Sequence, residues 1–141
     1  MILPDVNILV QAFREDSPRY EQIRPWLENL VSSESSFGLS ELILSGFLRV
    51  VTHPRVFDPP TPLEEALDFV ETLRSLPNCV LMAPGPRHWA IFTRLCRDSD
   101  AQGNLIPDAY LAALAIESGS DWVTADSDFS RFVGLRWSPL T

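Results

Sequence analysis

The sequence predicts an α/β protein, a three-layer α/β/α sandwich around a short parallel sheet. Short apolar segments with the character of strands alternate along the chain with amphipathic stretches about twelve residues long. Apolar strands that alternate with helices in this way are typical of a parallel sheet covered by helices on both faces.

The first half of the chain contains one predicted strand and four predicted helices. Residues 1–4 form a short buried strand that stops at Asp5, and a helical pattern follows over residues 7–13. Ser17-Pro18 is a helix start signal, with a cap followed by a proline. Residues 37–40 lead into a third helix through Glu41. The segment over residues 61–64 has the pattern of a capping box, which predicts a fourth helix after it.

The second half of the chain supplies the remaining strands and two more helices. Residues 79–82 and 121–124 are predicted strands, and residues 135–137 a last one. Residues 86–97 are expected to form a helix that buries Trp89. A regular helix runs from Asp108 to Gly119, which is its predicted C-cap. The proline-rich stretch over residues 58–62 is interpreted as a loop within one domain, so residues 1–141 are expected to form a single domain.

The composition excludes several classes of protein. All 11 basic residues are arginines, so a P-loop NTPase and a Schiff-base enzyme, which both need a lysine, are ruled out. The two cysteines, Cys79 and Cys96, are too few for a disulfide scaffold and too far apart for a CxxC metal site. We therefore expect reduced thiols and a cytoplasmic protein. Neither a signal peptide nor a membrane-spanning segment is expected, and no association with membranes.

Acidic residues follow the predicted strands. Asp5 ends the first strand, and Asp126 and Asp128 follow the strand at residues 121–124. Ligands of open parallel sheets bind beyond the carboxyl ends of the strands, so these acids are expected to face one crevice. Glu41 and Asp108 each stand in the first turn of a helix. Any one of these acids alone has a simpler interpretation as a helix cap.

Four carboxylates at one site would repel each other. A hard divalent cation, magnesium or manganese, relieves this repulsion without protonation and is typically held by a few carboxylates, water and substrate phosphates. The net charge of −8 would repel a nucleic acid, whereas a bound cation would attract its phosphates. The sequence therefore predicts a metal-dependent site for a phosphodiester.

Four motifs of the chain resemble, in order, those of PIN-domain ribonucleases, and most closely those of VapC-type toxins of bacterial toxin–antitoxin pairs. The motifs are Leu3-Pro4-Asp5-Val6-Asn7, Ser40-Glu41-Leu42, the run of residues 107–115 that begins Pro107-Asp108-Ala109, and Thr124-Ala125-Asp126-Ser127-Asp128-Phe129. The similarity extends over essentially the whole chain. It implies the PIN-like three-layer fold and magnesium-dependent hydrolysis of RNA. It also implies a small VapB-type antitoxin partner and a homodimer.

The resemblance also implies roles for individual residues. Asp5, Glu41, Asp108 and Asp126 match the acidic quartet of the family. Within the quartet, Asp5 and Asp108 are the expected metal ligands, while Glu41 and Asp126 would orient water or hold a second ion. Asp128 is the alternate for Asp126.

Two polar residues and one departure complete the implied site. Asn7 is expected to orient Asp5, and Thr124 to support the last acid. Val6 departs from the family, because many relatives carry a small hydroxyl residue at this position.

The arginines and histidines have two interpretations each. Arg87, Arg94 and Arg97 share one broad face of a predicted helix, where they could contact RNA phosphates or form an ordinary solvated face. Arg49 could balance the acidic cluster, although an ordinary ion pair is the plainer interpretation. His53 and His88 stand alone without a second histidine at ligand spacing, so a structural role is favoured for both.

Two other functions compete with a metal-dependent endoribonuclease. A non-catalytic PIN-like module that binds a protein partner would often have lost acids of the quartet, whereas all four are present here. A small phosphatase would carry the D-x-D-x-T signature after the first strand, where this chain instead has Asp5-Val6-Asn7-Ile8.

Overall fold

A computed structural model describes residues 1–140 and contains a five-stranded, fully parallel sheet. The strand order is β3-β2-β1-β4-β5, so the first strand lies at the centre. The strands span β1 (Ile2–Pro4), β2 (Phe37–Ser40), β3 (Cys79–Met82), β4 (Asp121–Val123) and β5 (Trp137–Ser138). The predicted α/β sandwich is therefore confirmed.

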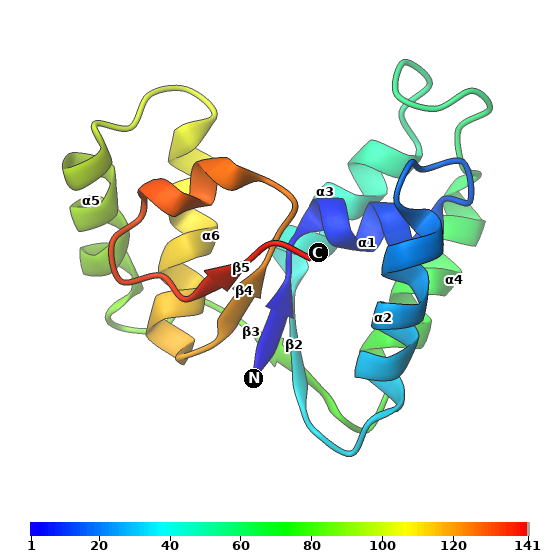
Figure 1. Cartoon of the computed structure of the whole chain (residues 1–141), viewed down its shortest axis with the longest axis horizontal. Helices are drawn as coiled ribbons and strands as arrows, with labels where there is room; N and C mark the ends of the chain where they lie inside the picture. Colours follow the sequence, from blue (N-terminus) through cyan, green and yellow to red (C-terminus); the bar gives the residue numbers. More distant parts are fainter. Residues whose placement is uncertain (141) are drawn as a thin grey trace.

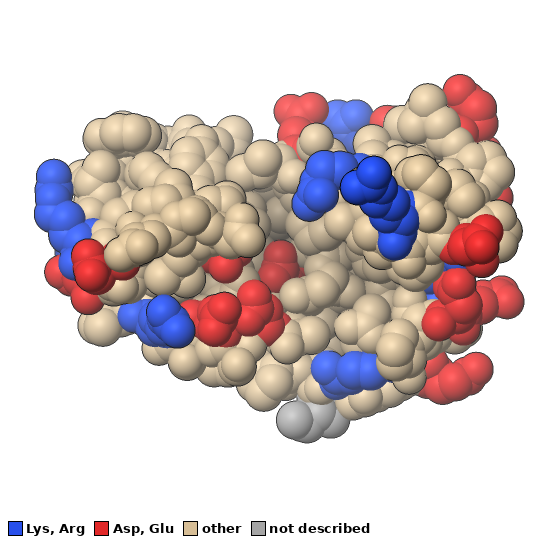
Figure 2. Space-filling model, turned by 90° about the horizontal axis from the view of Figure 1, so that it is seen from above, with Lys and Arg blue, Asp and Glu red and all other residues tan. Residues whose placement is uncertain are grey.

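Helices cover both faces of the sheet. They span α1 (Val6–Phe13), α2 (Tyr20–Ser32), α3 (Glu41–Val51), α4 (Leu63–Arg74), α5 (His88–Ser99) and α6 (Leu105–Ser118), with a 3₁₀ helix, η1 (Ser127–Arg131), after β4. Helices α1 to α4 lie on one side and α5 and α6 on the other (Figure 1). Seen from the carboxyl ends of the strands, the two halves are separated by a hollow (Figure 2).

The core lies between the sheet and these helices. Trp122 on β4 and Phe37 on β2 are fully buried, as are Ile8, Leu9 and Ala12 of α1. Burial of this apolar surface is the main source of stability for a parallel sheet that is covered on both faces.

Helices α1 and α3 approach each other closely at Gly46. A Cβ atom at this position would lie 2.9 Å from Cγ2 of Val6, so only glycine allows the observed contact. This contact fixes the position of α3 beside the start of α1, immediately after Asp5.

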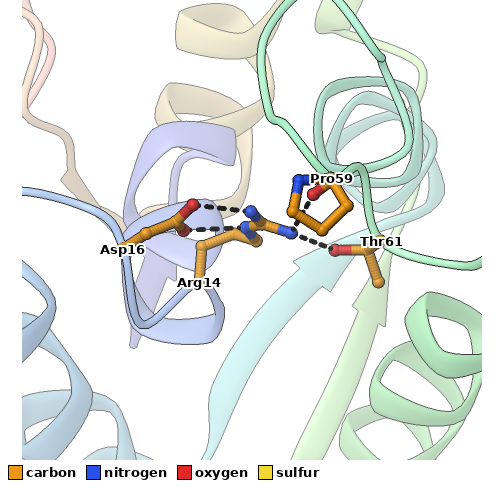
Figure 3. A network of polar contacts seen from close by, with 4 residues as sticks. All are labelled: Arg14, Asp16, Pro59 and Thr61. Atoms are coloured by element: carbon orange, nitrogen blue, oxygen red, sulfur yellow. Dashed lines mark hydrogen bonds and ion pairs between the residues drawn. The ribbon is translucent and has the colours of Figure 1, made fainter.

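One arginine anchors the proline-rich loop between α3 and α4. Arg14, the residue after α1, donates hydrogen bonds to both carboxylate oxygens of Asp16, at 2.9 and 2.6 Å. Its Nη1 donates to the carbonyl oxygen of Pro59 and to Oγ1 of Thr61, both at 3.1 Å (Figure 3). The guanidinium also lies 4.2 Å from the centroid of the Phe57 ring. A long loop is thereby tied to the end of α1.

The structure corrects several details of the sequence analysis. Residues 37–40, expected only to lead into a helix, form the strand β2, because they pair with β1 and β3. Helix α2 begins at Tyr20 with Arg19 as its N-cap, not at Ser17-Pro18, because these residues lie in a turn closed by the hydrogen bond from the backbone N–H of Tyr20 to the carbonyl oxygen of Ser17 at 3.2 Å. The last strand, β5, spans Trp137–Ser138 where residues 135–137 were expected.

Helix α4 begins at Leu63 without a side-chain cap, because the Thr61 hydroxyl accepts from Arg14 instead. In α5 the buried residues are His88 and Leu95, whereas Trp89 is 67% exposed. Nε2 of His88 lies 2.9 Å from the carbonyl oxygen of Tyr110, which offsets the cost of burying the ring.

Gly119 is the αL C-cap of α6, as predicted. Cys79 and Cys96 are both free thiols. Over residues 1–140, no helix combines the length and the apolar character needed to cross a membrane.

Candidate active site

A hollow of about 760 Å³ lies at the carboxyl ends of the central strands. Asp5, Asp108 and Asp126 line it together, although they come from the end of β1, from α6 and from the segment after β4. Acidic side chains are visible within the hollow in Figure 2. The strand order explains this convergence, because β1 and β4 are neighbours and both end at this edge of the sheet.

Asp5 is held rigidly at the junction of β1 and α1. It is the N-cap of α1, and its Oδ1 accepts a 2.6 Å hydrogen bond from the backbone N–H of Val6. Its Oδ2 accepts from the hydroxyl of Thr124 at 2.7 Å and from Nδ2 of Asn7 at 3.3 Å. Asp5 is only 6% exposed, so burial raises the pKa of its carboxyl to about 6, although these hydrogen bonds lower it.

Thr124 and Asn7 connect Asp5 to the segment that carries Asp126. The Thr124 hydroxyl donates to Asp5 and accepts the backbone N–H of Asp126 at 3.0 Å. The side chain of Asn7 donates to Asp5 and accepts the backbone N–H of Ala125 at 3.1 Å through Oδ1. The position of Asp126 relative to Asp5 is therefore fixed by two side chains, not by the backbone alone.

The structure separates Asp126 from Asp128. Asp126 lines the hollow, and its Oδ1 accepts the backbone N–H of Asp128 at 2.9 Å as the N-cap of η1. Asp128 does not line the hollow, but its charge contributes to raising the pKa of Asp108.

Asp108 stands in the first turn of α6, on the opposite wall. Burial, together with the charges of Asp126, Asp5 and Asp128, raises the pKa of its carboxyl to about 6, and burial is the largest of these causes. Among residues 1–140, no arginine side chain lowers the pKa of Asp108 or of Asp5. The hollow therefore concentrates negative charge that the protein itself does not neutralise.

Glu41 lies apart from these three acids. It is the first residue of α3, where the Ser40 hydroxyl accepts the backbone N–H of Leu42 at 3.2 Å. Its side chain lines an adjoining apolar hollow of about 490 Å³ that shares Leu42 and Pro107 with the acidic one. The structure thus brings three of the four predicted acids into one hollow and places the fourth, Glu41, in the adjoining hollow.

The residues of the acidic hollow suit a divalent cation that keeps several water ligands better than one that is bound by protein atoms alone. Among residues 1–140, no three Asp, Glu, His or Cys side chains are grouped closely enough to hold a metal ion. Magnesium often keeps several waters and binds to only one or two carboxylates plus substrate phosphates. Asp5 and Asp108, whose pKa values are both raised by burial and by neighbouring charge, are the residues that could hold it.

The predicted arginine contacts lie elsewhere. Arg87, Arg94 and Arg97 are exposed on or just before α5, and none of them lines the acidic hollow. Nη2 of Arg87 instead donates to the carbonyl oxygen of Glu117 at 3.2 Å.

Several polar residues line the hollow that the sequence analysis did not single out. They are Gln11, Ser45 and Asn104. They carry no motif of their own, and only the helical spacing of Ser45 relative to Arg49 could have placed it on this wall.

A family model described as "PIN domain" matches residues 2–135. The chain therefore belongs to the PIN-domain family, a class of protein whose fold it shares.

Relatives that are similar over nearly their full length include VapC ribonucleases. Ribonuclease VapC25 of Mycobacterium tuberculosis is 40% identical over 136 residues, which cover 96% of each chain. The VapC ribonuclease Mb2897 of Mycobacterium bovis is 44% identical over 137 residues, or 97% of this chain and 93% of the relative.

Solved structures with the same fold come from toxin–antitoxin systems. VapBC2 from Rickettsia felis, bound to a DNA fragment from its promoter, contains a chain with a TM-score of 0.74 and 18% identity, with full coverage of both chains. Mycobacterium tuberculosis VapC20, a toxin that cleaves the sarcin–ricin loop, has a TM-score of 0.69 and 16% identity over 96% of this chain and 99% of that one.

Proposed function

We propose that this chain is a single-domain, divalent-metal-dependent endoribonuclease and the toxin of a toxin–antitoxin pair. The observation that carries the proposal is the hollow that Asp5, Asp108 and Asp126 line together. Its full-length relatives of 40% and 44% identity are named ribonucleases, which supports RNA as the substrate.

The chain's own residues would prepare the site in three ways. Asp5 and Asp108 would hold magnesium or manganese, which supplies an activated water and neutralises charge on the phosphodiester. Thr124 and Asn7 hold Asp5 in one orientation, so that little reorganisation is needed when the substrate binds. Asp126 would orient water next to the scissile phosphate, with Glu41 acting from the adjoining hollow and Asp128 as the alternate of Asp126.

Cleavage of RNA by the purified protein tests this function. We expect cutting with magnesium or manganese, none with a chelator, and loss of activity in Asp5→Asn and Asp108→Asn. The matched control is Asp68→Asn, an exposed acid in the middle of α4. Equal cutting by Asp108→Asn and Asp68→Asn would contradict the proposal. Magnesium binding without RNA cleavage would favour the non-catalytic PIN-like module.

The antitoxin would be a small VapB-type protein that presents a basic residue to the hollow. An arginine placed among carboxylates forms strong charge-assisted hydrogen bonds and would compete with the metal ion. Structures of VapBC complexes with the same fold support such a partner. Co-expression of the product of a neighbouring small gene should suppress the RNA cleavage.

A second copy of this chain would cover the apolar hollow next to Glu41. Leu42 and Ile106, which line it, are 49% and 37% exposed, and the exposed ring of Trp89 packs on Phe92 at its edge. Light scattering should give a dimer that Trp89→Asp dissociates. Val133→Asp, at a site of similar exposure (69%), is the matched control and should leave the dimer intact.

A further inference from the structure

We propose that Arg49 binds a backbone phosphate of the RNA strand and holds that strand against the acidic hollow. This inference rests on the proposed function and adds a substrate-binding residue to it. Among the described residues that line the hollow, Arg49 alone carries a positive charge.

One face of α3 forms a wall of the hollow. Leu42, Ser45, Gly46, Arg49 and Val50 all line it, and their spacing of three and four residues places them along one side of the helix. The close contact of Gly46 with Val6 fixes this face beside Asp5. The guanidinium of Arg49 therefore projects from a wall whose distance from the acids is set by packing.

The Arg49 guanidinium has no partner within the described part of the chain. Among residues 1–140, the ion pairs involve Arg14, Arg24, Arg74 and Arg136, and no hydrogen bond is made by the Arg49 side chain. Arg49 is exposed, so its donors face solvent. The expectation that Arg49 forms an ordinary ion pair is therefore wrong, and its five N–H donors are available to an anion.

The surroundings of Arg49 suit a nucleic-acid strand. Leu111 of α6 and Asn104, the residue before that helix, line the hollow, and so does the apolar Val10 of α1. An RNA strand has chemical groups that suit both kinds of residue. Its anionic phosphates can bind the arginine, and its flat, partly apolar bases can pack on the apolar and amide side chains. The carboxylates would repel such a strand, and Arg49 supplies attraction at the same opening.

Binding of a short, labelled, single-stranded RNA of mixed sequence tests the contact in an Asp108→Asn background, where cutting is disabled. We expect Arg49→Ala to weaken binding roughly five- to tenfold and to reduce the slope of log affinity against log salt by about 1. Arg49→Lys should retain part of the affinity, because it keeps the charge but loses the forked geometry. Melting curves check that each variant is folded.

Arg136→Ala is the matched control. It changes the net charge by the same amount, but Arg136 pairs with Asp121 at the amino end of β4, away from the hollow. It should leave RNA affinity and salt slope unchanged. Equal losses in Arg49→Ala and Arg136→Ala would overturn the inference, since they would reflect net charge alone.

RNA cleavage, measured in proteins that retain Asp108, distinguishes a role of Arg49 in binding RNA from a structural role. Arg49→Ala should raise KM while the pH profile of cleavage stays unchanged. A shifted pH profile with unchanged RNA affinity would overturn the inference, because Arg49 would then act by balancing the carboxylates. RNA that is bound through Arg49 but not cut by the unsubstituted protein would contradict the proposed function and leave the contact in place. Absence of RNA binding would overturn both.

Discussion

The hydroxyl of Thr124 donates a 2.7 Å hydrogen bond to Oδ2 of Asp5, a residue 119 positions earlier in the chain. Thr124 is completely buried, so water does not compete for this bond. Because the same hydroxyl accepts from the backbone of Asp126, one side chain sets the arrangement of two acids.

Replacing Thr124 by valine should impair the site without creating a cavity in the core. The shape is retained, but the pKa of Asp5 should rise further because the hydrogen bond from Thr124 lowers it. We expect RNA cleavage to fall roughly 10- to 100-fold, with the acid limb of its pH profile moved to higher pH. Thr124→Ser, which keeps the hydroxyl, should stay close to the unsubstituted rate. Similar losses in the serine and valine variants would contradict this role.

The raised pKa values also predict how stability depends on pH. In the folded chain Asp5 and Asp108 both titrate at about 6, against 3.8 for an unperturbed carboxyl. The folded state therefore binds more protons than the unfolded state between these two pH values. The contribution of these two carboxyls to the free energy of unfolding is present below about pH 4 and is lost as the pH rises from about 4 to above 6.

In buffer without divalent ions, the melting temperature of Asp108→Asn should accordingly increase relative to that of the unsubstituted protein as the pH rises through this range. Thermal denaturation across the pH range measures the difference. Asp68→Asn should show none. A constant difference for Asp108→Asn would mean that its carboxyl is not perturbed.

Magnesium should stabilise the folded protein at neutral pH, because it relieves the repulsion in the hollow. At ten times its dissociation constant the expected gain is about 1.4 kcal/mol, or roughly 3–6 °C in Tm. Asp5→Asn and Asp108→Asn should lose this gain, whereas Asp68→Asn should keep it. A gain that survives in both site variants would place the ion elsewhere.

Gly46→Ala tests the packing of α3 against α1. The added methyl group would lie 2.9 Å from Val6, so we expect a loss of about 1–2 kcal/mol in the free energy of unfolding despite the better helix propensity of alanine. In a Val6→Ala background the same change should become neutral or stabilising. Denaturant unfolding of the four proteins of this cycle measures the coupling, and additive effects would contradict a steric contact.

The acids that follow strands could be predicted from the sequence, whereas the position of Glu41 could not. Asp5 and Asp126 come after β1 and β4, which are neighbours in a parallel sheet, so the convergence follows from topology. Which residue of the first turn of α3 faces the hollow depends on helix phase. The Ser40 cap and the Gly46 contact set this phase, and they turn Leu42 toward the acids.

Helix phase also explains the error in α5. Its apolar residues allow one phase that buries Trp89 and Cys96 and another that buries His88 and Leu95. The observed helix takes the second, in which His88 and Leu95 are buried. The choice depends on the carbonyl of Tyr110 in α6, a partner for His88 that no local pattern reveals.

The division of the hollow between strand ends and helix faces allows its chemistry and its selectivity to change separately. The acids after β1 and β4 are locked to one another through Thr124 and Asn7, so exchanges there disturb several contacts at once. Within the described part of the chain, the side chains of Ser45 and Arg49 on the α3 wall make no hydrogen bonds to these acids, and both are exposed. Under the proposed function, substitutions along this single helix would therefore change which RNA is accepted, while the acids after β1 and β4 stay unchanged.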